Sequence, residues 1–284
     1  MFNYNFPQPF VAGNYAFIAS TFITYKGKGI MNWATKWEIF INKISYNNYD
    51  NNYVRMLGNG LMVTVKIAVL GLLIGIVIGT LIAAFLVAPK YKFYVRALDK
   101  VFTVYTAFFR GTPIMVQLLL AYYVFLPMIG VKGVNPENVG VIIFGLNSGA
   151  YVSEIMRGGI KSVDIGQMEA GRAVGLSYGV TMIKIVIPQA IKNILPTLGN
   201  EFITLIKETS VLSFITVVDL YNALRNIATA NQNYEFVIPY IVLGLIYIIL
   251  VLLITLLVRL IEKLFSKSDR SYGESRKKRQ AVKA

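Results

Sequence analysis

The chain has 284 residues, of which 56% are hydrophobic and 15% are charged, and its formal net charge is +14 at pH 7. This composition is too apolar and too poor in charge for an ordinary soluble domain, so it indicates an integral membrane protein. Cysteine and histidine are both absent, which excludes disulfide frameworks, thiol nucleophiles, zinc clusters and histidine acid–base chemistry. The basic residues cluster beside apolar runs, which favours a membrane-orientation signal over nucleic-acid binding.

Residues 1–57 are predicted to form an extracytoplasmic segment that is partly disordered or interfacial, since stretches such as "SYNNYDNNY" could not fill a bilayer. Residues 10–25 are apolar but of marginal length, which leaves a sixth span as an alternative. A second hypothesis places the native start at Met31. The codons possible for residues 26–30 can resemble a bacterial ribosome-binding site just upstream of it.

Five apolar runs predict an all-α polytopic membrane protein with about five transmembrane helices between residues 58 and 262. The runs cover residues 61–88, 113–129, 139–156, 191–217 and 236–261. Lys66 is expected to snorkel from one end of the first run. Glycines at steps of four predict close helix packing of the first and third runs. They are Gly71, Gly75 and Gly79 in the first run, and Gly145 and Gly149 in the third.

Basic residues predict the orientation of these runs. They follow the first run as Lys90, Lys92, Arg96 and Lys100, the third as Arg157, Lys161, Arg172, Lys184 and Lys192, and the fifth as Arg276, Lys277, Lys278 and Arg279. The positive-inside rule puts all three groups in the cytoplasm. The segment 166–189, the basic tail 263–284 and the carboxyl terminus are therefore expected inside the cell.

The segment 166–189 reads "GQMEAGRAVGLSYGVTMIKIVIPQ". It resembles the cytoplasmic EAA motif of ABC importer permeases, with Glu169 and Ala170 at its start, Gly175 at its centre and Pro188 at its end. Gly171 departs from the third position of the motif, and Ile187 replaces its usual Leu. We expect Glu169 in the first turn of a short helix, a left-handed Gly175 that ends the helix, and a new span beginning at Pro188. An ordinary amphipathic interfacial helix is the alternative.

Three further motifs occur in the order typical of the polar amino acid branch of that superfamily. They are "FFRGTPIMVQ" at 108–117, "AYVSEIMRGGIKSVDIGQ" at 150–167 and "KETSVL" at 207–212, the last departing from the family at Glu208 and Val211. The resemblance covers about residues 58–262 and implies the type I importer fold. It further implies a permease subunit in a bacterial cell membrane that imports polar or charged amino acids.

The same resemblance implies the partners. Glu169, Ala170, Gly171 and Gly175 would couple the spans to a cytoplasmic ATP-binding subunit. A second permease subunit, identical or related, and an extracytoplasmic substrate-binding protein would complete the transporter. No G-x-x-x-x-G-K-[ST] motif is present, so ATP hydrolysis is expected from another chain, and we predict no enzyme activity, cofactor or metal site here.

Polar residues within or beside the apolar runs are the candidates for the substrate path: Arg110, Asn147, Glu154, Lys207, Glu208, Thr209 and Ser210. Charges at such depth must face protein or water, and Arg110 and Glu154 are the expected partners of Lys207 and Glu208. Arg110 could neutralise a lipid headgroup, which is a structural role, or approach a substrate carboxylate or an acidic partner such as Glu154. A structural salt bridge between helices is the alternative to substrate contact. Thr112 and Pro113 are expected to form the N-cap and first turn of a helix.

Two other functional classes share some of these features. A stand-alone secondary carrier or channel would also use broken helices and buried charge, but it has no need of a docking segment with this spacing. A membrane-embedded hydrolase would need a nucleophile with a base at one depth. Asp164, Glu169 and Ser177 lie on the cytoplasmic side without histidine, which disfavours it.

Overall fold

The computed structural model describes residues 33–45, 53–87, 93–229 and 236–281, and every regular element in these ranges is helical. The all-α prediction is confirmed. The possible span at 10–25 and the hypothetical start at Met31 lie outside the described residues. The elements at the amino-terminal side are α2 (Trp33–Ser45), α3 (Tyr53–Val87), α4 (Phe93–Gly111), α5 (Ile114–Leu119), the π-helix η1 (Leu120–Phe125) and α6 (Leu126–Met128).

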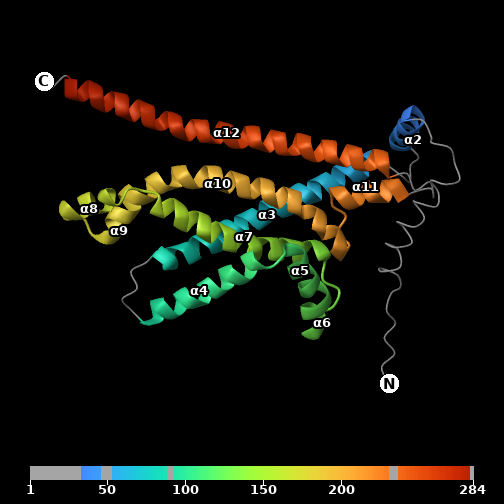
Figure 1. Ribbon diagram of the computed structural model, residues 1–284, viewed down its shortest axis with the longest axis horizontal. Helices are drawn as coiled ribbons and strands as arrows, with labels where there is room; N and C mark the ends of the chain where they lie inside the picture. The colour runs from blue at the N-terminus through green and yellow to red at the C-terminus, as the bar shows by residue number, and fades with distance from the viewer. Residues whose placement is uncertain (1–32, 46–52, 88–92, 230–235, 282–284) are drawn as a thin grey trace.

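The second half of the chain continues the bundle (Figure 1). Its elements are α7 (Pro136–Lys161), α8 (Ile165–Ala173), α9 (Tyr178–Thr181), the π-helix η2 (Met182–Val186), α10 (Ile187–Glu208), the 3₁₀ helix η3 (Thr209–Ile215), α11 (Leu220–Thr229) and α12 (Val237–Ala281). In Figure 1, α8 and α9 lie at the same end as the carboxyl terminus, and α2 and α11 lie at the other. The backbone of α12 passes position 262 without a break.

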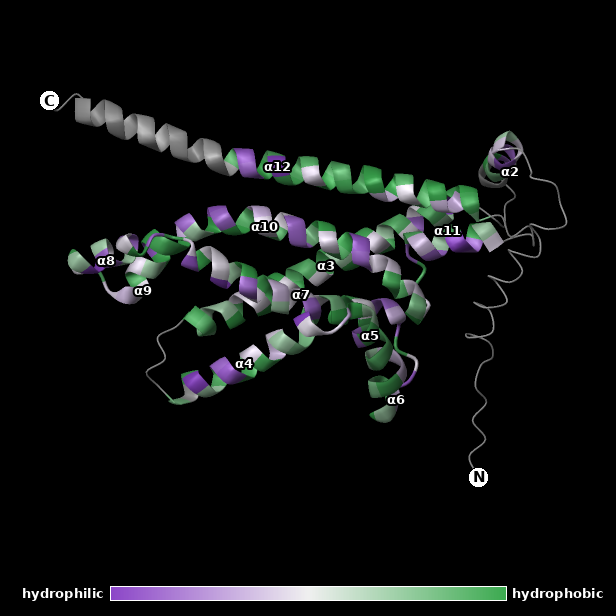
Figure 2. Cartoon of the chain, viewed as in Figure 1, coloured by the Kyte–Doolittle hydropathy of each residue, from purple (hydrophilic) through white to green (hydrophobic). Residues whose placement is uncertain are grey.

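Among the described residues, three helices are long and apolar enough to cross a membrane: α3, α7 and α12 as far as Leu264. A fourth span is broken, because Val95–Gly111 and Ile114–Met128 meet at an angle of 104°. The sequence predicted a span at residues 113–129 that gains length from the segment before it, but it did not predict the bend between the two parts. Helix α10 has 22 residues, about 33 Å, which also suffices to cross, and it packs against α7 and α12. Figure 2 shows the first part of α12 mostly green, and purple residues near the start of α4.

Helices α3 and α7 are parallel and form the centre of the bundle through their glycines. A Cβ added at Gly71 would lie 3.0 Å from Phe144 Cβ, one at Gly75 2.7 Å from Ser148 Cβ, and one at Gly79 2.7 Å from Val152 Cβ. On α7, a Cβ at Gly145 or Gly149 would meet Ile74 or Ile78 of α3. The predicted close packing is therefore confirmed, with one glycine of α3 every turn against α7.

Two local details differ from the sequence prediction. Helix α3 begins at Tyr53, eight residues before the predicted start, and Lys66 Nζ lies 2.7 Å from Glu137 Oε2 in the first turn of α7. Lys66 therefore has a partner on the neighbouring helix, and its snorkelling to a membrane interface stays a prediction. Thr112 is not an N-cap, because Pro113 is the cap residue of α5 and Thr112 Oγ1 donates to Phe108 O at 2.8 Å.

Candidate functional site

The segment that links α7 to α10 forms two short helices connected by a tight turn. Asp164 caps α8, since its Oδ1 accepts from Gly166 N at 2.8 Å. At the other end, Leu176 N donates to Gly171 O at 3.1 Å and Gly175 N to Arg172 O at 3.0 Å, with Gly175 at φ +87°. These two bonds define a Schellman motif, so the predicted left-handed Gly175 is confirmed. Ser177 then caps α9.

Glu169 is not in the first turn of α8, contrary to expectation. The helix begins at Ile165 and its acidic cap is Asp164, so Glu169 lies in the second turn and is exposed. An N-cap side chain accepts a hydrogen bond from a free amide of the first turn, and Asp164 occupies that position. Glu169 is therefore available to a partner rather than committed to its own helix.

The outer side of α8 and α9, which the resemblance predicts to be a coupling surface and which we call the coupling surface, is exposed and partly apolar. Ile165 and Val174 are 73% and 77% exposed, and Glu169 and Ala170 are exposed beside them. Gly171 is buried instead, and a Cβ there would lie 3.0 Å from Thr181 Oγ1. The departure from the family's Ala at this position thus has a packing reason, because α8 approaches α9 too closely for a side chain.

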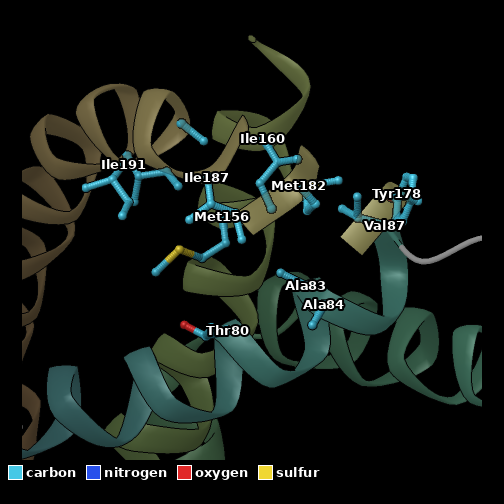
Figure 3. Close-up of a pocket in the computed structure, with 12 residues that line it drawn as sticks. Thr80, Ala83, Ala84, Val87, Met156, Ile160, Tyr178, Met182, Ile187 and Ile191 are labelled. Carbon is cyan, nitrogen blue, oxygen red and sulfur yellow. The ribbon is translucent and has the colours of Figure 1, made fainter. Parts of the chain in front are cut away.

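An apolar cavity of about 380 Å³ lies between this segment and the spans (Figure 3). Its lining includes Ala83 of α3, Met156 and Ile160 of α7, Tyr178 of α9 and Ile187 of α10. A polar amino acid would lose its hydrogen bonds to water there without replacement. The cavity is therefore a poor candidate for the substrate site.

The candidate path residues separate into two groups in the structure. One group lies where the broken span meets α7 and the other at the end of α10: Arg110, Asn147 and Glu154 in the first, and Lys207, Glu208, Thr209 and Ser210 in the second. Arg110 Nη1 lies 3.8 Å from Glu154 Oε2, its guanidinium lies 5.5 Å from the centre of the Tyr151 ring, and Glu154 also pairs with Arg157. The expected pairing of Arg110 and Glu154 with Lys207 or Glu208 is wrong. Helix α10 is antiparallel to α7 and brings Glu201 beside Ser148. Lys207 lies six residues beyond Glu201, on the side away from Glu154. It is therefore about 9 Å further from Glu154 along the bundle than Glu201 is.

The "KETSVL" residues lie at a helix end rather than inside one. Lys207 and Glu208 end α10, and Thr209 and Ser210 begin η3. Thr209 is fully buried and its hydroxyl donates to Ile206 O, whereas Lys207 is exposed on the surface of this single chain. A chain that changes from α to 3₁₀ geometry turns these side chains in directions that regular helical spacing does not predict.

Glu201 was missed by the sequence reasoning. It lies in α10, partly buried, and its Oε1 accepts a hydrogen bond from Ser148 Oγ at 3.0 Å. The only signal was the position of this acid near the middle of the run 191–217, in "LGNEFITL"; the other acid of that run is Glu208 of the "KETSVL" motif. A lone acid inside a span is expensive unless it has a function or a partner. Asn147, next to Ser148, is buried, and its amide donates to Phe109 O and Gln117 Oε1.

No metal site accompanies these residues in the part of the chain that the structure describes, where no three Asp or Glu side chains gather closely enough to hold an ion.

Comparison with known proteins accounts for this arrangement. Residues 75–267 match the family described as binding-protein-dependent transport system inner membrane component. The chain belongs to this family. It is a membrane-embedded transport component, which agrees with the recognition made from the motifs.

The permease is similar to several curated proteins. It is 42% identical over 188 residues to the putative glutamine transport system permease protein GlnP of Rickettsia bellii, covering 66% of this chain and 83% of that one. It is 37% identical to the arginine transport system permease protein ArtQ of Bacillus subtilis, with 66% and 82% covered. It is also 37% identical to the L-cystine transport system permease protein TcyB of the same organism, with 72% and 84% covered.

Solved structures share the fold. A crystal structure of an amino acid ABC transporter with histidines matches this permease with a TM-score of 0.68 at 37% identity, covering 74% of this chain and 94% of that one. A structure of the MetNI methionine ABC transporter, inward facing, matches with a TM-score of 0.60 at 17% identity, covering 75% and 97%. The second likeness concerns the fold alone.

Proposed function

We propose that this permease imports a polar or charged amino acid as the membrane-spanning subunit of an ABC transporter, with its coupling surface docked on a separate ATP-binding subunit. The capped α8–α9 pair carries the proposal. It extends from the end of the bundle and exposes Ile165 and Val174, although neither lies in an apolar span. Exposed apolar side chains beside a charged one are typical of a protein contact. Relatives named for glutamine, arginine and L-cystine supply the substrate class.

The proposal includes a second permease subunit, since charged residues of this chain are exposed at membrane depth. The side chain of Arg110 is 44% exposed, and Lys207 is exposed at the end of α10. Lipid would make such exposure costly, about 2.5–3.5 kcal/mol for each charge on insertion scales. A water-filled path between two subunits removes this cost, and an extracytoplasmic binding protein would deliver the amino acid to it.

The orientation follows from the position of the basic residues. Arg96 and Lys100 at the start of α4, Lys161 at the end of α7 and Arg172 in α8 belong to the end of the bundle where α12 terminates. The positive-inside rule makes this end, with the carboxyl terminus, cytoplasmic. Membrane-impermeant labelling of single cysteines at Val174 and Met128 tests it, since only the second should react from outside.

Co-purification of the tagged permease from its native membrane, followed by mass spectrometry and reconstitution, tests the function. An ATP-binding subunit should be recovered in stoichiometric amount, and proteoliposomes should take up amino acid only with ATP inside. Uptake by the permease alone would instead establish a stand-alone carrier.

Glu201→Gln is expected to lower uptake of the native amino acid at least about tenfold while the protein still assembles. We place Glu201 in the substrate path, because an acid inside a span is costly unless it has a function or a partner. Glutamine keeps the size and can still accept from Ser148, so the variant removes the acid group and leaves the packing. Initial uptake rates and the thermal unfolding midpoint are measured together, with Glu262→Gln in α12 as the control. Normal uptake would remove Glu201 from the path, and a lower unfolding midpoint with normal uptake per folded molecule would make its role structural.

A further inference from the structure

The break between α4 and α5 leaves backbone carbonyls without helical partners. In a continuous helix Phe109 O would accept from the amide of residue 113, but that residue is Pro113 and has no N–H. Thr112 O would accept from Val116 N, which instead donates to Pro113 O at 3.0 Å. Because a buried carbonyl without a hydrogen-bond donor is costly, each of these carbonyls needs another donor.

Two buried side-chain amides supply these donors. Gln117 Nε2 donates to Phe109 O and to Thr112 O, both at 3.0 Å, and lies 2.8 Å from Thr112 Oγ1. Asn147 Nδ2 of α7 donates to Phe109 O at 3.1 Å and to Gln117 Oε1 at 3.0 Å. Gln117 and Asn147 are 6% and 4% exposed, so both amides are engaged with protein rather than with water.

The same bend places Arg110 against α7. Arg110 follows Phe109, and it contacts Tyr151 and Glu154. Asn147, Tyr151 and Glu154 are spaced i, i+4 and i+7, which puts them on one face of α7. The broken span therefore contacts three successive groups on that face: the amide of Asn147, the ring of Tyr151 and the carboxylate of Glu154.

We propose that Gln117 and Asn147 form an amide latch, which holds the break between α4 and α5 at one angle and so positions Arg110 on the α7 face. Neither amide needs to touch substrate for this role, which reassigns Asn147 from the substrate path to a positioning residue. The link to transport rests on the proposed function. The latch itself is a property of the bend.

Distance measurements test the latch directly. The chain has no cysteine, so Lys100→Cys in α4 and Met128→Cys in α6 give one spin-label pair that spans the break. The labelled permease is measured within its transporter complex in lipid nanodiscs, without substrate. Gln117→Met and Asn147→Leu remove the donors at similar volume and are expected to broaden or shift the distance distribution. Asn193→Leu removes an amide that bridges α10 to Ser162 far from the break, and should not change it.

A double-variant cycle separates the latch from simple packing. Pro113→Ala restores the missing N–H, so Gln117→Met should cost less in that background than alone. In the parental background, Gln117→Met is expected to change the ratio of the latched to the altered bend about 5- to 30-fold, which corresponds to a free-energy change of about 1–2 kcal/mol. Additive effects, or an unchanged distance distribution in both donor variants, would overturn the proposal.

Folding failure also decides the question. If Gln117→Met does not fold alone, recovery of folded protein on adding Pro113→Ala supports the latch, and failure of the double variant overturns it. The label distance does not depend on transport. Transport of a different class of substrate would therefore refute the proposed function, whereas the label distances would still show the latch.

Discussion

Gly75→Leu is expected to prevent assembly of a stable permease. A Cβ at this position would lie 2.6 Å from Ser148 Oγ, 2.7 Å from Ser148 Cβ and 3.1 Å from its backbone carbon, so the new side chain must force α3 away from α7. Overpacking of this kind typically costs up to about 3 kcal/mol, and backbone cannot move aside as a flexible side chain does. The displaced Ser148 would also lose its contact with Glu201.

The fraction of protein recovered in monodisperse form and the thermal unfolding midpoint in detergent measure this effect. Gly244→Leu is the matched control, because Gly244 lies in the apolar part of α12 and nothing lies within 4 Å of an added Cβ. We expect Gly75→Ala to be intermediate, since the first carbon already meets Ser148. A Gly75→Leu protein with the parental unfolding midpoint would show that α3 and α7 do not pack through their glycines.

Glu169→Lys is expected to reduce ATP-driven uptake at least about tenfold while the permease folds normally. Glu169 is exposed on α8, where substitutions usually change stability by less than about 0.5 kcal/mol. At a docking surface the reversed charge adds a repulsive element to the contact, and about 1.4 kcal/mol of lost contact energy corresponds to a tenfold effect. The loss should appear in uptake and in binding of the ATP-binding subunit together.

Glu38→Lys provides the matched control, because Glu38 is an exposed acid on α2 at the opposite end of the bundle. Uptake at the parental rate by the Glu169 variant would refute the coupling role. Gly175→Trp would not isolate the contact with a partner. Gly175 has φ +87°, so any L side chain there strains the turn by about 1–2 kcal/mol before a partner is involved. Gly175→Asn tolerates that conformation better and isolates the contact.

The sequence by itself determined the features that depend on local chemistry. Long apolar runs require helices in a bilayer, so the all-α fold and the approximate positions of α3, α7 and α12 could be predicted. A glycine can end a helix through its own left-handed φ, so the end of α8 before Gly175 was predictable, whereas the Ser177 cap of α9 was not predicted. Glycines at steps of four predicted a close contact, although the contact's partner was not predictable from one helix.

Only the tertiary structure decided which polar groups meet. Lys66 and Glu137 are 71 positions apart, and Ser148 and Glu201 are 53 apart, so each pair depends on the relative register of two helices. Arg110 pairs with Glu154 because the span breaks at Pro113, and no spacing rule states the angle of that break. A buried polar group takes the partner that packing brings within about 3 Å. In this chain that partner is set by helix register and by one missing N–H.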